Sequence, residues 1–480
     1  MYCQLEALRH CLPPSLRGIL EELPDTLDET YERVLREIHK ANREHARRLL
    51  QCLTAAVRPL RVEELAEVLA IDFAAPAHGG IPELNPNWRW ADHHQAVLST
   101  CSSLITIIDD EDFQVVQFSH FSVKEFLTSD RLARSSRDIS RYHIALEPSH
   151  TILAQACLGV LFRLDDRVID DNNDDMRLVE YASRHLFDHA GFEKVASHIR
   201  DAMEYFFDAD KPHWTSWSRV QKIDVRWWWW IAPDEGSNDA LPLYYISLGG
   251  FYDLAEHLVG KHPEHVNARG GMMTTPLVTA LHRGHFQIAE LLHRHGADVN
   301  LRDKQDYTLL HGACENGILN VIQWLLNHGA DVNTLSNAAV PYAPIDTAVG
   351  WGMLQVVRML IEYNSDINNV PTMFGGVPLH LAASPLVFDN QVSILQLLLD
   401  HGANPNARND DGSTPLHNCS WWKNGHPVQF WGSVEGTRLL LKHGAILDAE
   451  DNEGRTPLQL ALEHDRQDIA ACLREYGATR

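Results

Sequence analysis

Cysteine is scarce in this chain, and its eight cysteines are far apart. No C-x-x-C pair and no cysteine-dense segment occurs, which excludes a disulfide-stabilised secreted domain. The N-terminus has no basic stretch followed by an apolar core of about seven residues, so it is not a signal peptide. No apolar run approaches the roughly 20 residues that cross a bilayer. We therefore expect an intracellular protein with reduced thiols and no membrane partner.

Basic side chains are in deficit. The chain has 41 Lys and Arg against 65 Asp and Glu, which gives a formal net charge of −24. Such a surface repels the phosphates of nucleic acids and of anionic lipids. We expect no direct nucleic-acid partner, and a basic or neutral protein partner if charge contributes to binding. The cytoplasm is favoured over the nucleus because no basic nuclear-localisation cluster occurs.

Motifs of enzymes and nucleotide-binding proteins are missing. A P-loop needs G-x-x-x-x-G-K-[ST], but Gly79-Gly80 and Gly249-Gly250 are isolated pairs without a following Gly-Lys. No G-x-S-x-G sequence places a nucleophile on a sharp turn. We therefore expect no enzymatic activity and no cofactor.

Histidine is abundant, with 28 residues, which raises the question of metal binding. Three histidines lack the H-E-x-x-H spacing that puts two rings on one helical face: His257, His262 and His265. Residues 165–175 resemble the start of a calcium loop but have no glycine at its sixth position. We expect a solvated loop there, and no metal site in the chain.

The second half of the chain repeats a pattern. Segments such as HGADVN recur. The second residue of their Gly-Ala pair, or the residue at that position, is found every 33 to 42 residues, at Ala297, Ala330, Ser365, Ala403, Ala445 and Ala478. Segments such as TPLH open each unit. A period near 33 residues with T-P-L-H is the pattern of the ankyrin repeat. We predict about seven repeats over residues 239–480, the first degenerate and the last a polar cap.

The recurring residues have structural explanations. Threonine at the N-cap and proline at the first helical position start the inner helices, at Thr275, Pro276, Thr414, Pro415, Thr456 and Pro457. Leucines such as Leu277 begin an apolar stripe. Glycines end the outer helices in a left-handed conformation, at Gly296, Gly329, Gly402 and Gly444. The ankyrin resemblance implies that the rings of His311, His380 and His417 bridge turns by hydrogen bonds.

Two departures from the repeat pattern are informative. Counted from the unit that opens at Thr275, the third unit has Pro341, Ala343 and Pro344 in place of the threonine start, and Asn364-Ser365 in place of Gly-Ala. The fourth and fifth units are lengthened, by residues 385–390 and 420–432. Extra residues in repeat arrays emerge as loops on one face, which is often the binding face.

The first half predicts another fold. Thr26-x-x-Glu29 opens a helix, two helical segments follow within residues 43–71, and a third covers 91–103. LITII and FQVVQF alternate like two strands joined by residues 109–112, and Ser122-x-x-Glu125 begins a closing helix. This outline is a winged helix. Its third helix has no Lys or Arg and its wing tip has four consecutive acids, which favours a packing or autoinhibitory role over DNA binding.

Two blocks of this region carry a family resemblance. LPDTLDETYERVL and HFSVKEFLTS resemble the segment that follows the nucleotide-binding domain in fungal NACHT-ankyrin proteins of the STAND class, and the similarity covers nearly the entire chain. The resemblance implies a winged helix, a helical connector and an ankyrin sensor downstream of a nucleotide switch. Since no P-loop occurs, nucleotide binding is not carried over, and we expect a family member that begins after the switch.

The expected architecture is mainly α: a helical segment (1–60), a winged-helix-like domain (61–135), a helical connector (136–238) and an ankyrin-repeat α-solenoid (239–480). Trp227–Trp230 are expected to pack the connector onto the first repeat. Candidate partner-binding residues are aromatic or charged and lie at repeat ends, finger tips or insertions: Trp351, Trp421, Trp422, Lys423, Asp303, Lys304, Asp410, Asp411 and Glu453.

The expected function is a protein-interaction scaffold or adaptor, as the regulatory portion of a NACHT-ankyrin signalling protein. One alternative is a transcription co-regulator that acts by protein contacts, for example of a fungal biosynthetic gene cluster. Another is a nucleotide-dependent switch, which requires an upstream NACHT domain.

Overall fold

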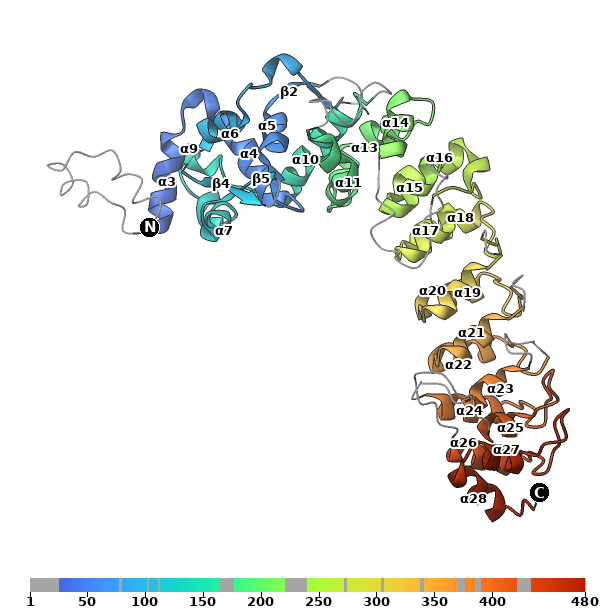
Figure 1. Cartoon of the computed structure of the whole chain (residues 1–480). Coiled ribbons are helices and arrows are strands. Elements are labelled where there is room, and N and C mark those ends of the chain that lie inside the picture. Colours follow the sequence, from blue (N-terminus) through green and yellow to red (C-terminus); the bar gives the residue numbers. More distant parts are fainter. Residues whose placement is uncertain are drawn as a thin grey trace. The chain divides into compact units, whose positions relative to one another are not determined.

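The chain forms two compact units, residues 1–279 and 280–480, which are described separately (Figure 1). The structure is a computed structural model. It describes residues 26–76, 80–101, 103–110, 113–164, 177–220, 240–271, 274–303, 306–336, 341–369, 376–384, 390–420 and 433–479. Among these residues, no helix combines the length and the apolar character that a membrane crossing requires.

The first unit begins with helices around a small antiparallel sheet. The strands lie in the order β1 (Leu60–Arg61), β5 (Phe113–Phe118) and β4 (Ile105–Asp110). Three helices pack on one another beside this sheet: α4 (Arg43–Ala55), α5 (Val62–Leu69) and α6 (His93–Cys101). The chain order of helix, strand, two helices and two strands is that of a winged helix, as predicted. Because α4 contacts α5, α6 and β5, this helix belongs to the same core, although it precedes the expected boundary at residue 61.

The wing matches the predicted strand pair, with one difference. Asp109 pairs with Gln114 and Asp110 with Phe113, so these two acids extend β4 instead of forming the loop. A second hairpin, β2 (Ile71–Pro76) and β3 (Pro82–Leu84), was not predicted. It is followed by the short helix η4 (Pro86–Trp88).

Helix starts agree with the sequence at one position and differ at another. The helix α3 (Leu27–Glu37) begins as expected, because the Thr26 hydroxyl accepts a hydrogen bond from the Glu29 amide at 3.2 Å. The prediction that Ser122 starts α7 (Phe121–Leu127) is wrong: the N-cap is His120, whose Nδ1 accepts from the Ser122 amide. The Ser122 hydroxyl instead lies 2.8 Å from the Tyr31 hydroxyl, which ties α7 to α3.

A helical connector follows the winged helix. Its central contact is between α10 (Leu146–Leu161) and α11 (Val179–Ala190), and α10 also packs on α4 and β3. The other helices are shorter: η2 (Lys40–Asn42) before α4, then α8 (Asp130–Ala133), α9 (Arg137–Ser140), α12 (Val195–His198), α13 (Arg200–Phe206) and α14 (Pro212–Val220).

Aromatic side chains join the connector to the first repeat. The ring centroids of Trp214 and Trp217, both in α14, lie 5.6 and 5.0 Å from that of Tyr245 in α15 (Pro242–Gly249). Phe206 and Phe207 complete the cluster, which is buried. Trp227–Trp230, which were expected to make this contact, lie outside the described residues, as does the calcium-loop-like segment 165–175.

The first helical pair of the repeat region consists of α15 and α16 (Tyr252–Lys261), followed by the 3₁₀ turn η7 (Pro263–His265). The limit between the two units falls within the next helix, α17 (Pro276–His282). That helix begins at a proline as expected, and the Thr275 hydroxyl accepts a hydrogen bond from the Val278 amide at 3.3 Å.

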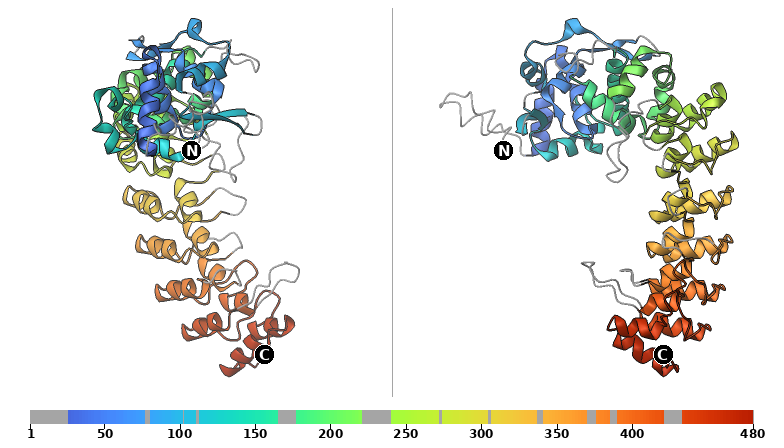
Figure 2. Two further views of the ribbon diagram at one scale, coloured as in Figure 1. Left: turned by 90° about the vertical axis from the view of Figure 1, so that its left-hand side faces the viewer. Right: turned by 45° about the vertical axis from the view of Figure 1, so that its right-hand side comes forward.

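The second unit consists of helix pairs stacked in chain order (Figure 2). From α19 to α27 each inner helix contacts the next inner helix, and from α20 to α28 each outer helix contacts the next outer helix. The helices are α18 (Phe286–Arg294), α19 (Leu309–Glu315), α20 (Leu319–Asn327), α21 (Pro344–Gly350), α22 (Leu354–Glu362), α23 (Pro378–Ala383), α24 (Gln391–Asp400), α25 (Pro415–Ser420), α26 (Val434–Lys442), α27 (Pro457–Glu463) and α28 (Gln467–Glu475).

Leucines fill the spaces between these pairs. The outer-helix leucines Leu325, Leu398 and Leu440 are fully buried, whereas Leu309 and Leu439 are half-buried. A short helix pair has too few residues to bury such a stripe alone, so burial depends on the neighbouring repeats. Gly296, Gly329, Gly402 and Gly444 end outer helices with φ between 85° and 89°, and Asn364 takes this left-handed role in the third unit with φ of 62°.

Replacing Leu398 with alanine is expected to destabilise the repeat array by about 2–5 kcal/mol, because the change leaves a cavity between α24 and its neighbours. Leu462 in α27 provides the control, since it is 40% exposed; its replacement by alanine should change the unfolding free energy by no more than about 0.5 kcal/mol. Urea unfolding followed by circular dichroism measures both. Equal losses in the two variants would contradict the assigned core.

Candidate protein-interaction surface

Histidines connect successive repeats. His311 Nε2 lies 3.1 Å from the Tyr342 carbonyl oxygen, His380 Nε2 lies 3.0 Å from that of Ser413, and His417 Nε2 lies 3.1 Å from that of Arg455. In each ring Nδ1 accepts from a backbone amide at the start of its own helix. The ring is therefore neutral with its proton on Nε2, and burial lowers the pKa of all three histidines. This is the bridging geometry that the ankyrin resemblance implies.

The third repeat has an aspartate at the histidine position. Asp346 Oδ2 accepts from the Ala343 amide at 2.9 Å, as the histidine Nδ1 does elsewhere. Its Oδ1 has no hydrogen-bond partner among the described residues, and the side chain is fully buried. Burial raises the pKa of this carboxyl to about 8. The group therefore keeps its proton at neutral pH.

Asparagines form a second set of links that the sequence analysis did not identify. Asn368 Oδ1 accepts from the Asn404 amide at 2.8 Å, while its Nδ2 donates to the Gly402 carbonyl at 3.1 Å. Each member of this set accepts from a backbone amide of the next repeat: Asn300, Asn333, Asn368 and Asn406. The signal was present in the sequence as the recurring third residue of DVN, DVN, DIN and NPN.

The turns from one outer helix to the next inner helix are here called finger turns; they include residues 298–303, 404–413 and 446–455. The fifth and sixth are joined directly, since the Asn452 Nδ2 donates to the Asp410 carbonyl and the Asn452 amide to the Asp411 carbonyl, both at 3.0 Å. Arg408 also donates to the Glu450 carbonyl at 2.6 Å. Backbone carbonyls accept all three of these hydrogen bonds.

The predicted finger-tip acids fall into two groups. The side chains of Asp410, Asp411 and Glu453 are exposed and lie on these two joined turns, so the structure brings them together. Glu453 also pairs with Arg455 at 2.9 Å. Asp303 differs, because its half-buried carboxylate accepts from the Tyr307 amide at 2.8 Å and shapes its own turn. Lys304 lies outside the described residues.

The predicted aromatic contacts are apart from these acids. Trp351 follows the last residue of α21, at the end of that helix opposite to its finger turn, and its side chain is 49% exposed. Trp421, Trp422 and Lys423 lie outside the described residues. The structure thus provides a joined acidic edge on the fifth and sixth finger turns and a separate tryptophan on the third repeat.

The winged helix presents acids where a DNA-binding member of this fold would face phosphates. Asp109 and Asp110 are exposed at the end of β4, and α6 contains no Lys or Arg. His93 in α6 lies 2.6 Å from Arg177, within the connector. Carboxylates at this position repel a phosphate backbone.

Family models match both regions of the chain. The model described as "Ankyrin repeats (3 copies)" matches residues 243–336, "Ankyrin repeats (many copies)" matches 379–430, and "Ankyrin repeat" matches 411–452. The model "GPI inositol-deacylase, winged helix domain" matches residues 31–138. The chain contains ankyrin repeats and a winged-helix domain. The latter match starts within the segment 1–60, which was expected to be separate.

Parts of the chain are similar to curated proteins. "Azaphilone pigments biosynthesis cluster protein L" of Monascus ruber is 28% identical over 292 residues, 57% of this chain and 60% of that protein. "Putative ankyrin repeat protein FPV031" of fowlpox virus (strain NVSL) is 38% identical over 74 residues, 15% of this chain and 20% of that protein. "B-cell lymphoma 3 protein homolog" of Mus musculus is 40% identical over 76 residues, 16% of each chain. The chain thus spans less than two thirds of each relative.

One solved structure, "Crystal structure of human ASB11 ankyrin repeat domain", is 26% identical, with a TM-score of 0.38. The matched region covers 50% of this chain and 99% of the chain in that structure.

Asp346 should make the stability of the repeat array depend on pH. Its folded pKa of about 8 lies above the ordinary value of 3.8, so the stability it contributes is complete below pH 3.8 and is lost as the pH rises toward 8. Asp346→Asn, which cannot ionise, should remove a slope on the order of 1 kcal/mol per pH unit. Unfolding free energies at pH 5.5, 6.5 and 7.5 measure the difference.

Asp366→Asn is the control within the same repeat, because hydrogen bonds lower the pKa of Asp366 despite the opposing effect of its slight burial. This variant should leave the slope of the parent protein unchanged between pH 5.5 and 7.5. If the unfolding free energy of Asp346→Asn depends on pH as that of the parent protein does, Asp346 is ionised in the folded state and the assignment is wrong.

Proposed function

We propose that the chain is a non-enzymatic adaptor that binds a partner protein along the finger turns of its ankyrin repeats. The observation that carries the proposal is the edge formed by the fifth and sixth finger turns. Their backbones are held by the Asn452 and Arg408 hydrogen bonds, while the Asp410 and Asp411 side chains remain exposed. A surface whose backbone is fixed before binding loses little conformational entropy when a partner docks.

The charge of this edge indicates the chemistry of the partner. Asp410, Asp411 and Glu453 add local negative charge to a chain with a formal net charge of −24. A complementary partner carries lysine or arginine side chains at the contact, because opposite potentials speed association and like charges disfavour wrong partners. Trp351 is a candidate for an additional contact, since exposed tryptophan is frequent at binding hot spots.

Two cellular settings are compatible with such an adaptor. The winged-helix match and the NACHT-ankyrin resemblance support a regulatory portion of a signalling protein in the cytoplasm, with nucleotide binding confined to an upstream NACHT domain if one exists. The similarity to a Monascus ruber protein named for a pigment biosynthesis cluster supports the alternative, a regulator of such a cluster that acts through protein contacts. Fluorescence imaging of the tagged protein in its native cell separates the two settings, because the first predicts a cytoplasmic signal and the second a nuclear one.

The interaction test starts with proximity labelling in the native cell to identify a partner, followed by affinity measurements on the purified pair. The double variant Asp410→Lys with Asp411→Lys should weaken binding by about tenfold or more, since two reversed charges each cost on the order of 1 kcal/mol at a docked surface. Both side chains are exposed, and the two residues join the turns through their backbone carbonyls, so the substitutions should leave the fold intact.

The matched control reverses two exposed acids on outer helices, Glu362→Lys in α22 and Glu435→Lys in α26. It changes the net charge by the same amount and should leave the affinity within about twofold of the parent protein. An equal loss of affinity in both double variants would show that the overall charge of the chain, and not the acidic edge, causes the effect. A partner that binds equally well after removal of residues 280–480 would contradict the proposed function.

A further inference from the structure

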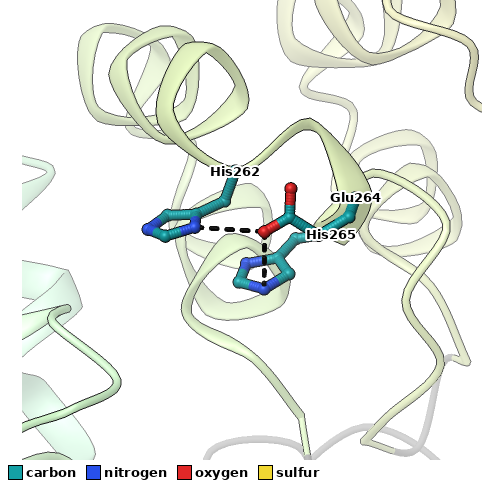
Figure 3. A group of neighbouring side chains, drawn as sticks. All are labelled: His262, Glu264 and His265. Carbon is teal, nitrogen blue, oxygen red and sulfur yellow. Dashed lines mark hydrogen bonds and ion pairs between the residues drawn. The ribbon is translucent and has the colours of Figure 1, made fainter.

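The turn that follows α16 brings two imidazole rings and one carboxylate together. His262 is the C-cap residue of α16, and Glu264 and His265 lie on the 3₁₀ turn η7 immediately after it. Figure 3 shows the Glu264 carboxylate beside both rings. His257, the third histidine of this segment, is not part of the group.

The distances in this group match those between metal ligands. Glu264 Oε1 lies 3.2 Å from His262 Nδ1 and 3.7 Å from His265 Nε2, and the three atoms all lie within 4.8 Å of one another. Around Zn²⁺ with bonds of about 2.0–2.1 Å, adjacent tetrahedral ligands are about 3.3 Å apart. The two separations from Glu264 are thus close to a coordination edge, and the third, between the two ring nitrogens, has to shorten from at most 4.8 Å when an ion binds.

The backbone of the turn holds these ligands in place. The His262 amide donates to the Leu258 carbonyl at 2.7 Å, and the His265 amide donates to the His262 carbonyl at 3.0 Å. Pro263, the first residue of η7, fixes its own φ angle. The two rings are stacked, with centroids 4.8 Å apart and planes at 12°, so both must rotate before their nitrogens can face one ion. The backbone of the turn is in place before any ion binds, which reduces the entropy that binding loses.

We propose that His262, Glu264 and His265 bind a divalent transition-metal ion, with Zn²⁺ as the reference ion and water completing its coordination. Two imidazoles and one carboxylate form the ligand set of open zinc sites, whereas Ca²⁺ and Mg²⁺ prefer oxygen ligands alone. The expectation that the chain has no metal site depended on finding two histidines on one helical face. A short turn after the helix provides another way to bring them together.

The test is a titration of the full-length protein with ZnCl₂ in a competing chelator, which reports stoichiometry and affinity. His262→Ala and His265→Ala should each weaken the tightest site by about tenfold or more, and the double variant should remove it. His257→Ala is the matched control, because His257 is exposed on α16 and outside the group. It should bind with the affinity of the parent protein.

A second measurement uses the parent protein, so its result does not depend on whether the variants fold. X-ray absorption spectroscopy at the zinc edge, on the parent protein loaded with one equivalent of Zn²⁺, should show two imidazoles and oxygen ligands, without sulfur. Sulfur in the coordination shell, or a double variant that is folded by circular dichroism and binds Zn²⁺ as tightly as the parent protein, would overturn the assignment.

Discussion

The second unit depends on one constraint: a short helix pair has more leucine surface than it can bury by itself. The outer helices are nine or ten residues long, too short to be stable alone in water. Each therefore requires the helix pairs on either side, and Leu325, Leu398 and Leu440 lose their contact with water only in the stack. The finger turns follow from the same constraint, because they are the segments that stacking leaves at one edge.

Polar links determine how the repeats register on one another. Hydrophobic burial is not directional, so it does not select one relative placement of two helix pairs. The bonds from His311, His380 and His417, and those from the asparagines beginning with Asn300, join specific backbone groups of adjacent repeats. At Asp346 a buried carboxyl replaces the ring that donates to the next repeat, so the stability of this repeat should fall as the pH rises toward 8.

Local patterns predicted much of the fold. The repeat period, the helix-starting prolines and the alternating strands of the wing depend on neighbours in the sequence, and they were found where expected. Contacts between distant residues were harder to predict. Trp214 and Trp217, which pack on Tyr245, were not singled out from the sequence, and the expected contact of Trp227–Trp230 lies outside the described residues. His120 caps α7 where Ser122 was expected, and the Ser122 hydroxyl lies within hydrogen-bonding distance of Tyr31, 91 positions away. The candidate site was only partly predictable, since Asp303 and Asp410 look alike in sequence but differ in burial.

The dependence of each repeat on its neighbours can be measured by hydrogen exchange. Removing residues 410–480 from the chain deletes α26, the outer helix that packs on α24. The account predicts that the amides of α24 lose protection by about tenfold or more, while those of α4 and α10 in the first unit exchange at unchanged rates. Full protection of α24 in the shortened chain would show that a helix pair is stable without its neighbour, and would contradict the account.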